Sequence, residues 1–530
     1  MLLKSIFTTI LSLSVAVQSA PLNKPELRET IERGMRRCGV PGMAIAIVHK
    51  NEVVFAEGFG KRNKDDPYTV DTVQPIGSVT KSFTATAIGE LVAEGKVDWD
   101  TTPVSKYLPE FKLKDPILTS QLTFVDMLSH RTGMPNVILN WLNSRESRRE
   151  IIKRLRYMDG IPRKLGVTTQ YNNVMYAVAG EAAANVAGTS YEDLVTNKVI
   201  RPLGLHNTGF STVNMKKTHP DNYSMPHMAD SFEAAQRGEL RVFPLNEIYM
   251  TYAPAGDIYS NVLDMAKWGQ TVMGLGKVDG KQVLNDTSIE ETLKAHTIFF
   301  EGRRGPDYGA AVTYGMGWIQ DSYKGAVFYR HNGATSGFTS DLIFYPDHDL
   351  VISSTSNIFG GSQFAEVLPS LIAETLLDLP KSDIDWVEDL AVPLSKSFYD
   401  QLLAPTGDLP PKIPNKPATF ANNLSAYVGE YSDPQFGAFV IGLEKGNNKT
   451  TTLTYKFNEF TSTLKHYHYD AFVASLDEPL FHNDALITFS ADPVSGRGRD
   501  KKKQPITRMQ IQEVPGAMGI SKKVFKKRRV

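Results

Sequence analysis

The sequence offers almost no covalent cross-linking and no strong overall charge. Cys38 is the only cysteine among 530 residues, so no intramolecular disulfide can form and stability must come from buried cores. Lysine plus arginine number 58, as do aspartate plus glutamate. This balance argues against nucleic acid as a partner, because nucleic-acid binding needs a basic excess. The length predicts two or more domains.

Long apolar runs are missing after the N-terminus. Residues 1–20 contain Lys4, an apolar stretch and the small residues Ser19 and Ala20, which is the pattern of a secretory signal peptide. The apolar stretch is too short to cross a bilayer, so we expect a secreted protein without stable membrane insertion. Export through a eukaryotic route would make the sequons glycosylation sites. These are Asn222, Asn285, Asn423 and Asn448.

Cys38 itself is predicted to be a small buried residue. It shares one helical face with Leu27, Ile31 and Met35, and free cysteine behaves as a small hydrophobe in such a position. The pattern therefore gives no support to a catalytic thiol.

Predicted strands stand at both ends of the first 380 residues, with helices between them. The strand patterns cover residues 43–49, 53–59, 337–345 and 350–356. Between about residues 200 and 320 the pattern is mixed and loop-rich. We therefore expect one α+β domain over residues 21–380 whose ends meet in a single sheet. No regular strand–helix alternation and no fixed-period repeat occurs, which excludes doubly wound and solenoid folds.

The C-terminal part has a different pattern. A helix and a Pro-rich linker occupy residues 381–417. Residues 418–530 read as short strands separated by turn residues, which predicts a small antiparallel β-barrel or sandwich. The expected strands are 427–431, 438–443, 451–457, 463–473, 485–489 and 506–513. The basic runs 497–503 and 522–529 are interpreted as solvated loop and tail.

The stretch 75–83 places a serine directly before a helical pattern. Ser78 therefore lies where free backbone N–H groups favour negative charge. Lys81 is three residues further on, so its amine comes up on nearly the same face and can take the serine's proton. A simple N-cap beside a solvated lysine is the other interpretation. Ser462 and Lys465 show the same spacing inside a predicted strand, so the motif needs corroboration.

A second polar stretch contains Tyr171 and Asn173, just before an apolar helix and hence on a turn. A phenol near an ammonium can be held as phenolate and act as a general base. An amide two residues further on can hold a substrate carbonyl. Because Tyr259 and Asn261 have the same spacing, a surface turn with an incidental tyrosine is the alternative.

A third stretch, His331-Asn332-Gly333, comes just ahead of the strand pattern that starts at Gly337. The glycine would let a substrate lie close against the strand, and the backbone N–H of Ala334 could complete an oxyanion hole. Histidine suits polar work near neutral pH, although a structural histidine is the simpler interpretation.

Taken in order, these stretches resemble the serine β-lactamase and penicillin-binding-protein family, and within it the branch of class C β-lactamases, DD-peptidases and esterases. The resemblance covers about residues 24–380 and rests on seven ordered segments: 78–81, 127–133, 171–176, 201–205, 255–260, 314–318 and 331–333. It implies a β-lactamase/transpeptidase-like α+β fold, an antiparallel sheet flanked by helices with a helical subdomain. Residues 427–431 resemble part of the lipocalin-like barrel that follows this domain in some members.

The resemblance also implies residue roles. Ser78 would be the nucleophile that forms an acyl-enzyme, and Lys81 and Tyr171 would share the removal and return of its proton. Whether Lys81 or Tyr171 is the base stays open. The substrate-binding residues that it implies are Asn173, His331, Gly333 and Ala334. The mechanism needs neither a metal nor an organic cofactor.

Asn332 departs from the family, which has a hydroxyl residue there in K-T-G or H-T-G. This change, and His331 in place of lysine, weaken the case for an anion pocket. We therefore expect an ester, lactone or amide substrate, a small molecule or short peptide, without an obligatory carboxylate. The alternatives are a D-amino-acid peptidase, a β-lactamase, or a non-catalytic binding module on the same scaffold. The barrel could contact the main domain or help to form homo-oligomers.

His466, His468 and Asp470 alternate along one predicted strand and would share one face. A solvated face is the better interpretation, since no fourth ligand accompanies them. The sequence thus predicts an enzyme that uses no metal.

Overall fold

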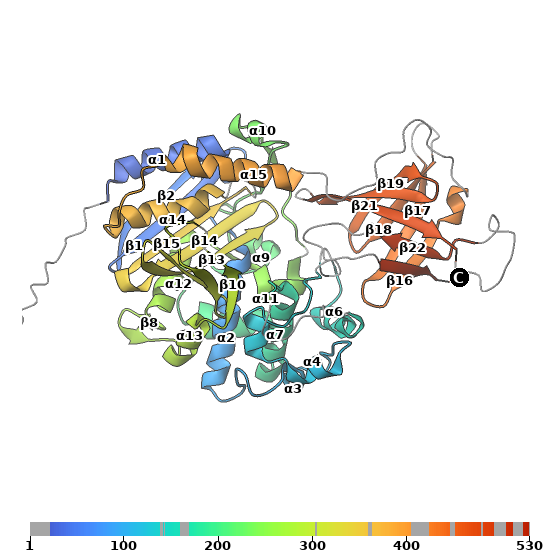
Figure 1. Cartoon of the computed structure of the whole chain (residues 1–530), viewed down its shortest axis with the longest axis horizontal. Helices are drawn as coiled ribbons and strands as arrows, with labels where there is room; N and C mark the ends of the chain where they lie inside the picture. The colour runs from blue at the N-terminus through green and yellow to red at the C-terminus, as the bar shows by residue number, and fades with distance from the viewer. Residues whose placement is uncertain are drawn as a thin grey trace, which may run out of the picture.

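The computed structural model describes residues 22–137, 141, 144–158, 169–247, 249–302, 305–358, 363–403, 423–445, 451–478, 481–491, 505–511 and 523–528. The predicted signal peptide, Asn448 and most of the Pro-rich linker lie outside these ranges. The chain forms an α+β unit followed by a β-barrel, which stands at the right in Figure 1. Within the described residues no helix has the length and apolar character that a membrane span requires.

An antiparallel sheet of eight strands forms the centre of the α+β unit. The strand order is β10-β11-β12-β13-β14-β15-β1-β2, so the N-terminal hairpin lies beside the last strands. Pairing of β1 (Gly42–His49) with β15 (Leu350–Ser356) joins the two ends of the unit, as predicted. The other strands are β2 (Glu52–Gly60), β10 (Thr297–Glu301), β11 (Ala311–Tyr314), β12 (Ile319–Tyr323), β13 (Ala326–Thr335) and β14 (Phe338–Tyr345).

Helices cover both faces of this sheet, as Figure 1 shows. One layer contains α1 (Lys24–Cys38), α14 (Gln363–Leu376) and α15 (Val392–Leu403), and the other contains α2 (Thr80–Ala93) and α12 (Val262–Met273). In β1 the side chains of Met43, Ile45 and Ile47 pack in the cluster of the first layer, and Ala44 and Ala46 pack in that of the second. All eight residues of β1 are buried, because a strand covered on both faces has no solvent side.

The remaining helices are short or form the helical subdomain around α7 (Asn173–Ala187). They are α3 (Val104–Tyr107), α4 (Pro116–Gln121), α5 (Phe124–Leu128), α6 (Arg148–Arg154), α8 (Tyr191–Val195), α9 (Thr212–Thr218), α10 (Phe232–Gln236), α11 (Ala253–Gly256) and α13 (Asp286–Leu293). Helix α5 begins with a capping box, since Thr123 and Asp126 each accept from the other's backbone nitrogen.

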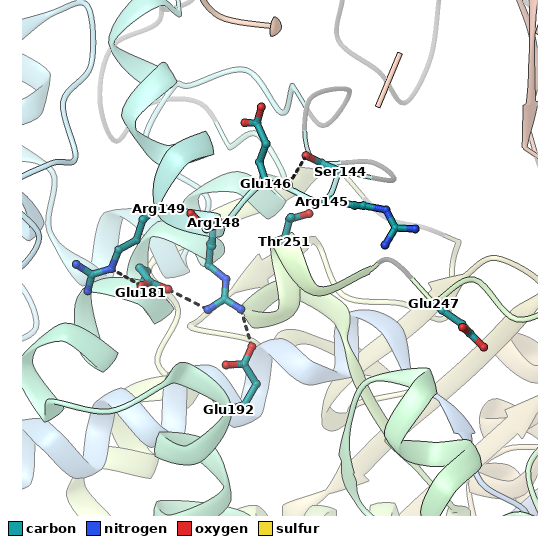
Figure 2. Close-up of a pocket in the computed structure, with 10 residues that line it drawn as sticks. Ser144, Arg145, Glu146, Arg148, Arg149, Glu181, Glu192, Glu247 and Thr251 are labelled. Carbon is teal, nitrogen blue, oxygen red and sulfur yellow. Dashed lines mark hydrogen bonds and ion pairs between the residues drawn. The ribbon is translucent and has the colours of Figure 1, made fainter. Parts of the chain in front are cut away.

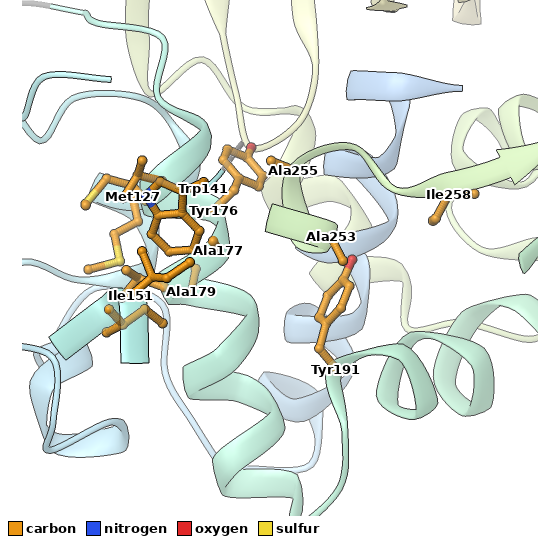
Figure 3. Packing of buried hydrophobic residues seen from close by; sticks show 14 of the residues in the cluster. Met127, Trp141, Ile151, Tyr176, Ala177, Ala179, Tyr191, Ala253, Ala255 and Ile258 are labelled. Carbon is orange, nitrogen blue, oxygen red and sulfur yellow. The ribbon is translucent and has the colours of Figure 1, made fainter. Parts of the chain in front are cut away.

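The core of the helical subdomain depends on small residues in α7. Figure 3 shows Ala177 and Ala179 of this helix among Met127, Trp141 and Ile151. A Cβ atom at Gly180 would lie 2.6 Å from the Pro254 side chain, so only glycine lets α11 pack this closely. This contact fixes α11 beside the N-terminal half of α2.

The C-terminal unit is a closed antiparallel barrel, as the resemblance implies, and it has eight strands where six were expected. They are β16 (Gly429–Asp433), β17 (Gly437–Lys445), β18 (Thr451–Phe457), β19 (Phe460–His468), β20 (Ala471–Glu478), β21 (Phe481–Ser490), β22 (Arg508–Ile511) and β23 (Lys523–Lys527). The single strand expected over residues 463–473 is wrong, because Tyr469 has a positive φ of 47° and turns the chain between β19 and β20. The expected tail contains β23, which closes the barrel by pairing with β16 and β22.

The structure also corrects the middle of the chain. The stretch between residues 200 and 320, expected to be loop-rich, supplies β10, β11 and the start of β12. Their side chains are only partly buried, so the alternation that identifies a strand in a sequence is weak there. Cys38 is buried as predicted, and burial raises the pKa of its thiol to about 11.

Candidate active site

Ser78 lies in a short 3₁₀ turn, Gly77–Val79, that leads directly into α2. Gly77 has a φ of +52°, a conformation that costs glycine little. A Cβ atom there would lie 2.7 Å from the backbone nitrogen of Ala334, so the turn packs directly against β13. The half-buried Ser78 side chain is thereby held where α2 meets the sheet.

Lys81 is fully buried one turn of helix further on. Its Nζ lies 2.9 Å from Ser78 Oγ, 2.8 Å from Asn173 Oδ1 and 2.8 Å from the carbonyl oxygen of Ala255. Burial lowers the pKa of this amine well below its ordinary value. An uncharged amine has two N–H donors, which Asn173 and Ala255 can accept, and one lone pair, which then faces the Ser78 hydroxyl.

Tyr171 contacts both Ser78 and Lys81. Lys81 Nζ lies 4.7 Å from the centre of its ring. Burial raises the pKa of the Tyr171 phenol, and its hydrogen bond with Ser78 opposes this rise only in part. Near neutral pH the side chain is therefore a phenol, which can both donate and accept a proton.

His130 supports Tyr171 and was not identified from the sequence. Its ring centroid lies 4.3 Å from that of Tyr171 and 4.7 Å from that of Tyr314. Its Nδ1 accepts a hydrogen bond of 3.1 Å from the backbone nitrogen of Asn172. Burial lowers its pKa, so the ring is neutral. The sequence did place His130 in segment 127–133, one of the segments that resemble the family. That resemblance alone does not indicate a contact between His130 and Tyr171.

Asn173 makes hydrogen bonds to other residues of the protein. Besides accepting from Lys81, it donates its backbone N–H to Asn136 Oδ1 at 3.0 Å. Asn172 caps the same helix, α7, by accepting from the backbone nitrogen of Met175. The helix N-terminus thus sets the position of the amide that holds Lys81.

The strand predicted from Gly337 is confirmed as β14, but the stretch from His331 to Gly333 itself lies in a strand, β13, which the sequence did not predict. The strand pattern from Gly337 is the second arm of a hairpin, whose register ends with Thr335 opposite Phe338. Gly337 has a φ of +79° and closes the turn. Both arms are therefore strands of the central sheet.

His331 is 1% exposed, and both of its ring nitrogens have partners. Nδ1 donates to the carbonyl oxygen of Asn332 at 2.6 Å, which leaves Nε2 to accept from the Tyr314 hydroxyl at 2.9 Å. Burial lowers the pKa of His331 to about 3, so it carries no charge at neutral pH. Tyr314 was likewise not identified from the sequence as a partner of the site.

Asn332 is directed to the opposite face of the sheet. Its Nδ2 donates to Glu366 Oε1 of α14 at 2.8 Å. Because neighbouring residues of a strand point to opposite faces, His331 and Gly333 face the Ser78 side and Asn332 does not. Because the side chain at position 332 points away from Ser78, the missing hydroxyl there is weak evidence against an anion pocket. The uncharged state of His331 is stronger evidence.

Ala334 is exposed and its backbone is directed toward Ser78. The hairpin pairs Thr335 with Phe338 around a two-residue turn, so this pair exchanges hydrogen bonds and the next one, Ala334 with Thr339, does not. The N–H of Ala334 hence points away from β14, to the side where Gly77 touches it. Ser78 and Ala334 can thus direct two backbone donors at one oxygen.

The other predicted sites lie away from Ser78. Asn423 is exposed, whereas Asn222 and Asn285 are half-buried and their side chains accept hydrogen bonds from Thr72 and Ser288. His466 and His468 end β19 at a bulge and Asp470 lies in the turn beyond, so the expected shared face is wrong. Among the described residues no three His, Cys, Asp or Glu side chains are grouped as metal ligands.

A polar cavity of about 540 Å³ lies between the segment 144–149 and α7 and α8, and its lining includes neither Ser78 nor Lys81. Figure 2 shows Arg148 at its centre, bonded to Glu181 at 2.9 Å and to Glu192 at 2.6 Å. These half-buried ion pairs tie α6 to α7 and α8. We assign the cavity a structural role.

Comparison with known proteins gives two family matches. The family described as Beta-lactamase matches residues 27–377, and a domain of unknown function, DUF3471, matches residues 414–499. The first match covers the whole sheet and both helical layers up to α14.

Among individual proteins, the unguisins hydrolase of Aspergillus campestris is 26% identical over 450 residues, which is 81% of this chain and 79% of that protein. Beta-lactamase-like protein 2 of Dictyostelium discoideum is 24% identical over 451 residues, 79% of this chain and 73% of its own length. The octameric penicillin-binding protein homologue from Pyrococcus abyssi shares the fold with a TM-score of 0.59 and 21% identity, over 95% of this chain and 100% of that one.

Proposed function

The chain belongs to the beta-lactamase family, and on that premise we propose that it is a serine hydrolase acting through an acyl-enzyme on Ser78. The observation that carries the proposal is the buried Lys81 amine, 2.9 Å from Ser78 Oγ. Burial lowers its pKa, which favours the uncharged amine that can accept a proton more than in an exposed lysine. Its family includes relatives named as hydrolases.

The reaction has two steps, acylation of Ser78 and hydrolysis of the acyl-enzyme. In each step the protons move only between the reacting groups, so the site gains or loses none. Lys81 takes the Ser78 proton as Oγ attacks the carbonyl carbon, and the backbone N–H groups of Ser78 and Ala334 stabilise the oxyanion. The phenol of Tyr171 donates its proton to the leaving atom and regains one from Lys81. A water molecule then attacks the acyl-enzyme by the reverse proton route, which releases the acid and restores Ser78.

Asn173 and His331 act in this proposal as positioning residues. Asn173 holds Lys81, and His331 holds Tyr314 beside His130 and Tyr171. Gly333 keeps β13 against the Ser78 turn, since a Cβ atom there would lie 1.9 Å from the carbonyl oxygen of Ile76. Neither ring nitrogen of His331 is available to a substrate.

The substrate we propose is an ester, lactone or amide that needs no carboxylate for recognition. Support comes from the uncharged state of His331, which leaves this side chain without the positive charge that would bind an anion. A D-amino-acid peptidase or a β-lactamase is the second candidate, favoured by the family itself.

The test compares kcat/KM for a short-chain acyl ester, a D-alanyl amide and a cephalosporin on the same preparation. We expect the ester to be preferred over the cephalosporin by at least about tenfold, because the cephalosporin carries a carboxylate to which the uncharged His331 offers no positive charge. A preference for the cephalosporin or the D-alanyl amide would move the assignment to the second candidate.

Export, glycosylation and assembly are proposed from the sequence. Residues 1–20 would be removed, residues 21–380 and 418–530 would fold as separate domains, and Asn423 is the most accessible described sequon. The Pyrococcus abyssi homologue is an octamer, which supports a homo-oligomer here. Mass spectrometry and light scattering of protein from culture medium check these points: a retained leader, unmodified Asn423 or a monomer would each reject the corresponding proposal.

A further inference from the structure

One residue of β10 is out of register with the sheet. Thr297 and Ile298 pair with Tyr314 and Thr313, and Phe300 pairs with Val312, so Phe299 has no partner of its own on β11. This is a β-bulge, in which an extra residue bends the strand and redirects its side chain. Bulges of this kind are frequent beside active sites.

The bulge directs Phe299 toward the tyrosines of the site. Its ring centroid lies 6.3 Å from that of Tyr171, edge to face, and 5.3 Å from that of Tyr314. Thr169, two residues before Tyr171, donates from its hydroxyl to the carbonyl oxygen of Ile298 at 2.5 Å. The strand and the Tyr171 segment are thus joined at two points.

Phe299 nevertheless keeps part of its surface in contact with solvent. Its strand neighbours Ile298 and Phe300 are each 53% exposed, so Phe299 is the most buried of the three. A half-buried aromatic ring next to the reacting groups offers apolar area that a substrate can still cover.

The position of Phe299 relative to Tyr171 decides which part of a substrate it meets. In the proposed reaction the carbonyl oxygen of the substrate lies between the N–H groups of Ser78 and Ala334. Tyr171 must face the leaving atom of the substrate in order to protonate it. A ring packed against Tyr171 hence lies on the leaving side of the scissile bond.

We propose that Phe299 is a specificity-determining residue that forms an apolar wall for the leaving group. This inference rests on the proposed acyl transfer to Ser78. The preferred substrates are then esters or amides whose released alcohol or amine carries an aliphatic or aromatic group next to the reacting atom.

The test uses the full-length protein and two substrate series. In the first, acetate esters of methanol, butanol and benzyl alcohol vary only the leaving group, and acid release gives kcat/KM, which includes acylation. In the second, 4-nitrophenyl acetate and hexanoate vary only the acyl group. The variants are Phe299→Ala, Phe299→Leu and, as the matched control, Phe300→Ala, which removes the more exposed neighbouring ring of the same strand.

We expect Phe299→Ala to lower the benzyl-to-methyl ratio of kcat/KM about tenfold, since an apolar group in a pocket discriminates by roughly this factor. Phe299→Leu should give an intermediate ratio, Phe300→Ala should give the native ratio, and the acyl series should keep its ratio in every variant. The leucine variant decides the matter if the alanine variant does not fold.

An unchanged benzyl-to-methyl ratio would overturn the inference, even if all rates fell together, because Phe299 would then only support Tyr171. A change confined to the acyl series would overturn it as well. In both cases a fluorophosphonate still labels Ser78, whereas loss of labelling in the native protein would mean that the proposed function itself has failed.

Discussion

Lys81 can accept a proton from Ser78 only while its amine is uncharged. Its three neighbours within hydrogen-bonding distance are neutral oxygens, which compensate for burial less than a carboxylate would. Between its lowered pKa and its ordinary value the unfolded chain binds a proton that the folded chain does not, so Lys81 destabilises the fold in that range, and the penalty shrinks as the pH rises. A residue kept at such a cost is expected to have a catalytic role.

The pH dependence of kcat/KM follows from these protonation states. As the pH falls through the lowered pKa of Lys81, the amine gains a proton and the rate should fall about tenfold per pH unit. His331 should add no further limb between pH 5 and 8, because its pKa of about 3 keeps it neutral there.

Tyr171→Phe separates the two candidate bases in the same measurement. With Lys81 as the base, the variant keeps the acid limb at the native pH and loses about 10²–10⁴-fold in its plateau, the range of one positioned proton donor. Loss or displacement of the limb would assign the base to Tyr171. Asn136→Ala is the control for a general disturbance of the site. It removes the acceptor of the Asn173 backbone N–H and leaves both candidate bases in place.

At this scale the sequence predicted that Ser78 and Lys81 lie together, because helix geometry places positions 78 and 81 on nearly the same face. It did not predict that Asn173 holds Lys81 or that His331 is enclosed by Tyr314. Those contacts depend on the register of β13 and on the approach of β11, which local patterns do not encode.

Among the elements, β13 is the one on which the site depends. Its residues from 331 to 335 pass the Ser78 turn, and β12 pairs with it only as far as Arg330. Two glycines allow the contact: Gly77 faces Ala334, and Gly333 faces the carbonyl oxygen of Ile76. The oxyanion donors therefore depend on close packing of backbone against backbone.

Gly333→Ala tests this packing. The added Cβ atom would lie 1.9 Å from the carbonyl oxygen of Ile76, so β13 must move away from the turn. We expect about 1–3 kcal/mol lower free energy of unfolding and a much slower reaction of Ser78 with a fluorophosphonate.

Gly305→Ala is the matched control, since its nearest neighbour, the Tyr308 ring, would be at an ordinary 3.5 Å. It should change the stability by less than about 0.5 kcal/mol. Equal labelling rates in the two variants and the native protein would contradict the importance of this packing. Urea unfolding and time-resolved labelling supply both values.

Sequence patterns predicted elements with strong signals and failed where the signal was weak. The strands β1 and β2 were predicted because runs of β-branched and apolar residues between turn residues are local features. The half-exposed β10 and β12 were not, and the turn at Tyr469 was not, since nothing at a single tyrosine marks a positive φ.

Across the whole molecule, the two units have separate strand pairings. The strands β16–β23 pair with one another, and the central sheet closes through β1 and β15. The barrel interior contains buried aromatic rings, among them Tyr431, Phe439 and Phe525, so it is a packed core. An ion pair of 3.0 Å between Arg145 and Glu459 connects the units, and both side chains are too exposed for it to add much stability.

The division into two units was accessible from the sequence because composition and strand pattern change near residue 418. The close approach of the barrel to the segment before α6 was not, since single ion pairs between distant residues leave no trace in a local pattern.

The most direct measurement of the central claim is the intact mass of the protein after exposure to a serine-directed fluorophosphonate. The account predicts one adduct on the native protein, none on Ser78→Ala, and one on Ser462→Ala, which removes the serine of the second S-x-x-K in β19. No adduct on folded native protein would favour a non-catalytic binding module. Labelling that survives in Ser78→Ala would show that another serine reacts.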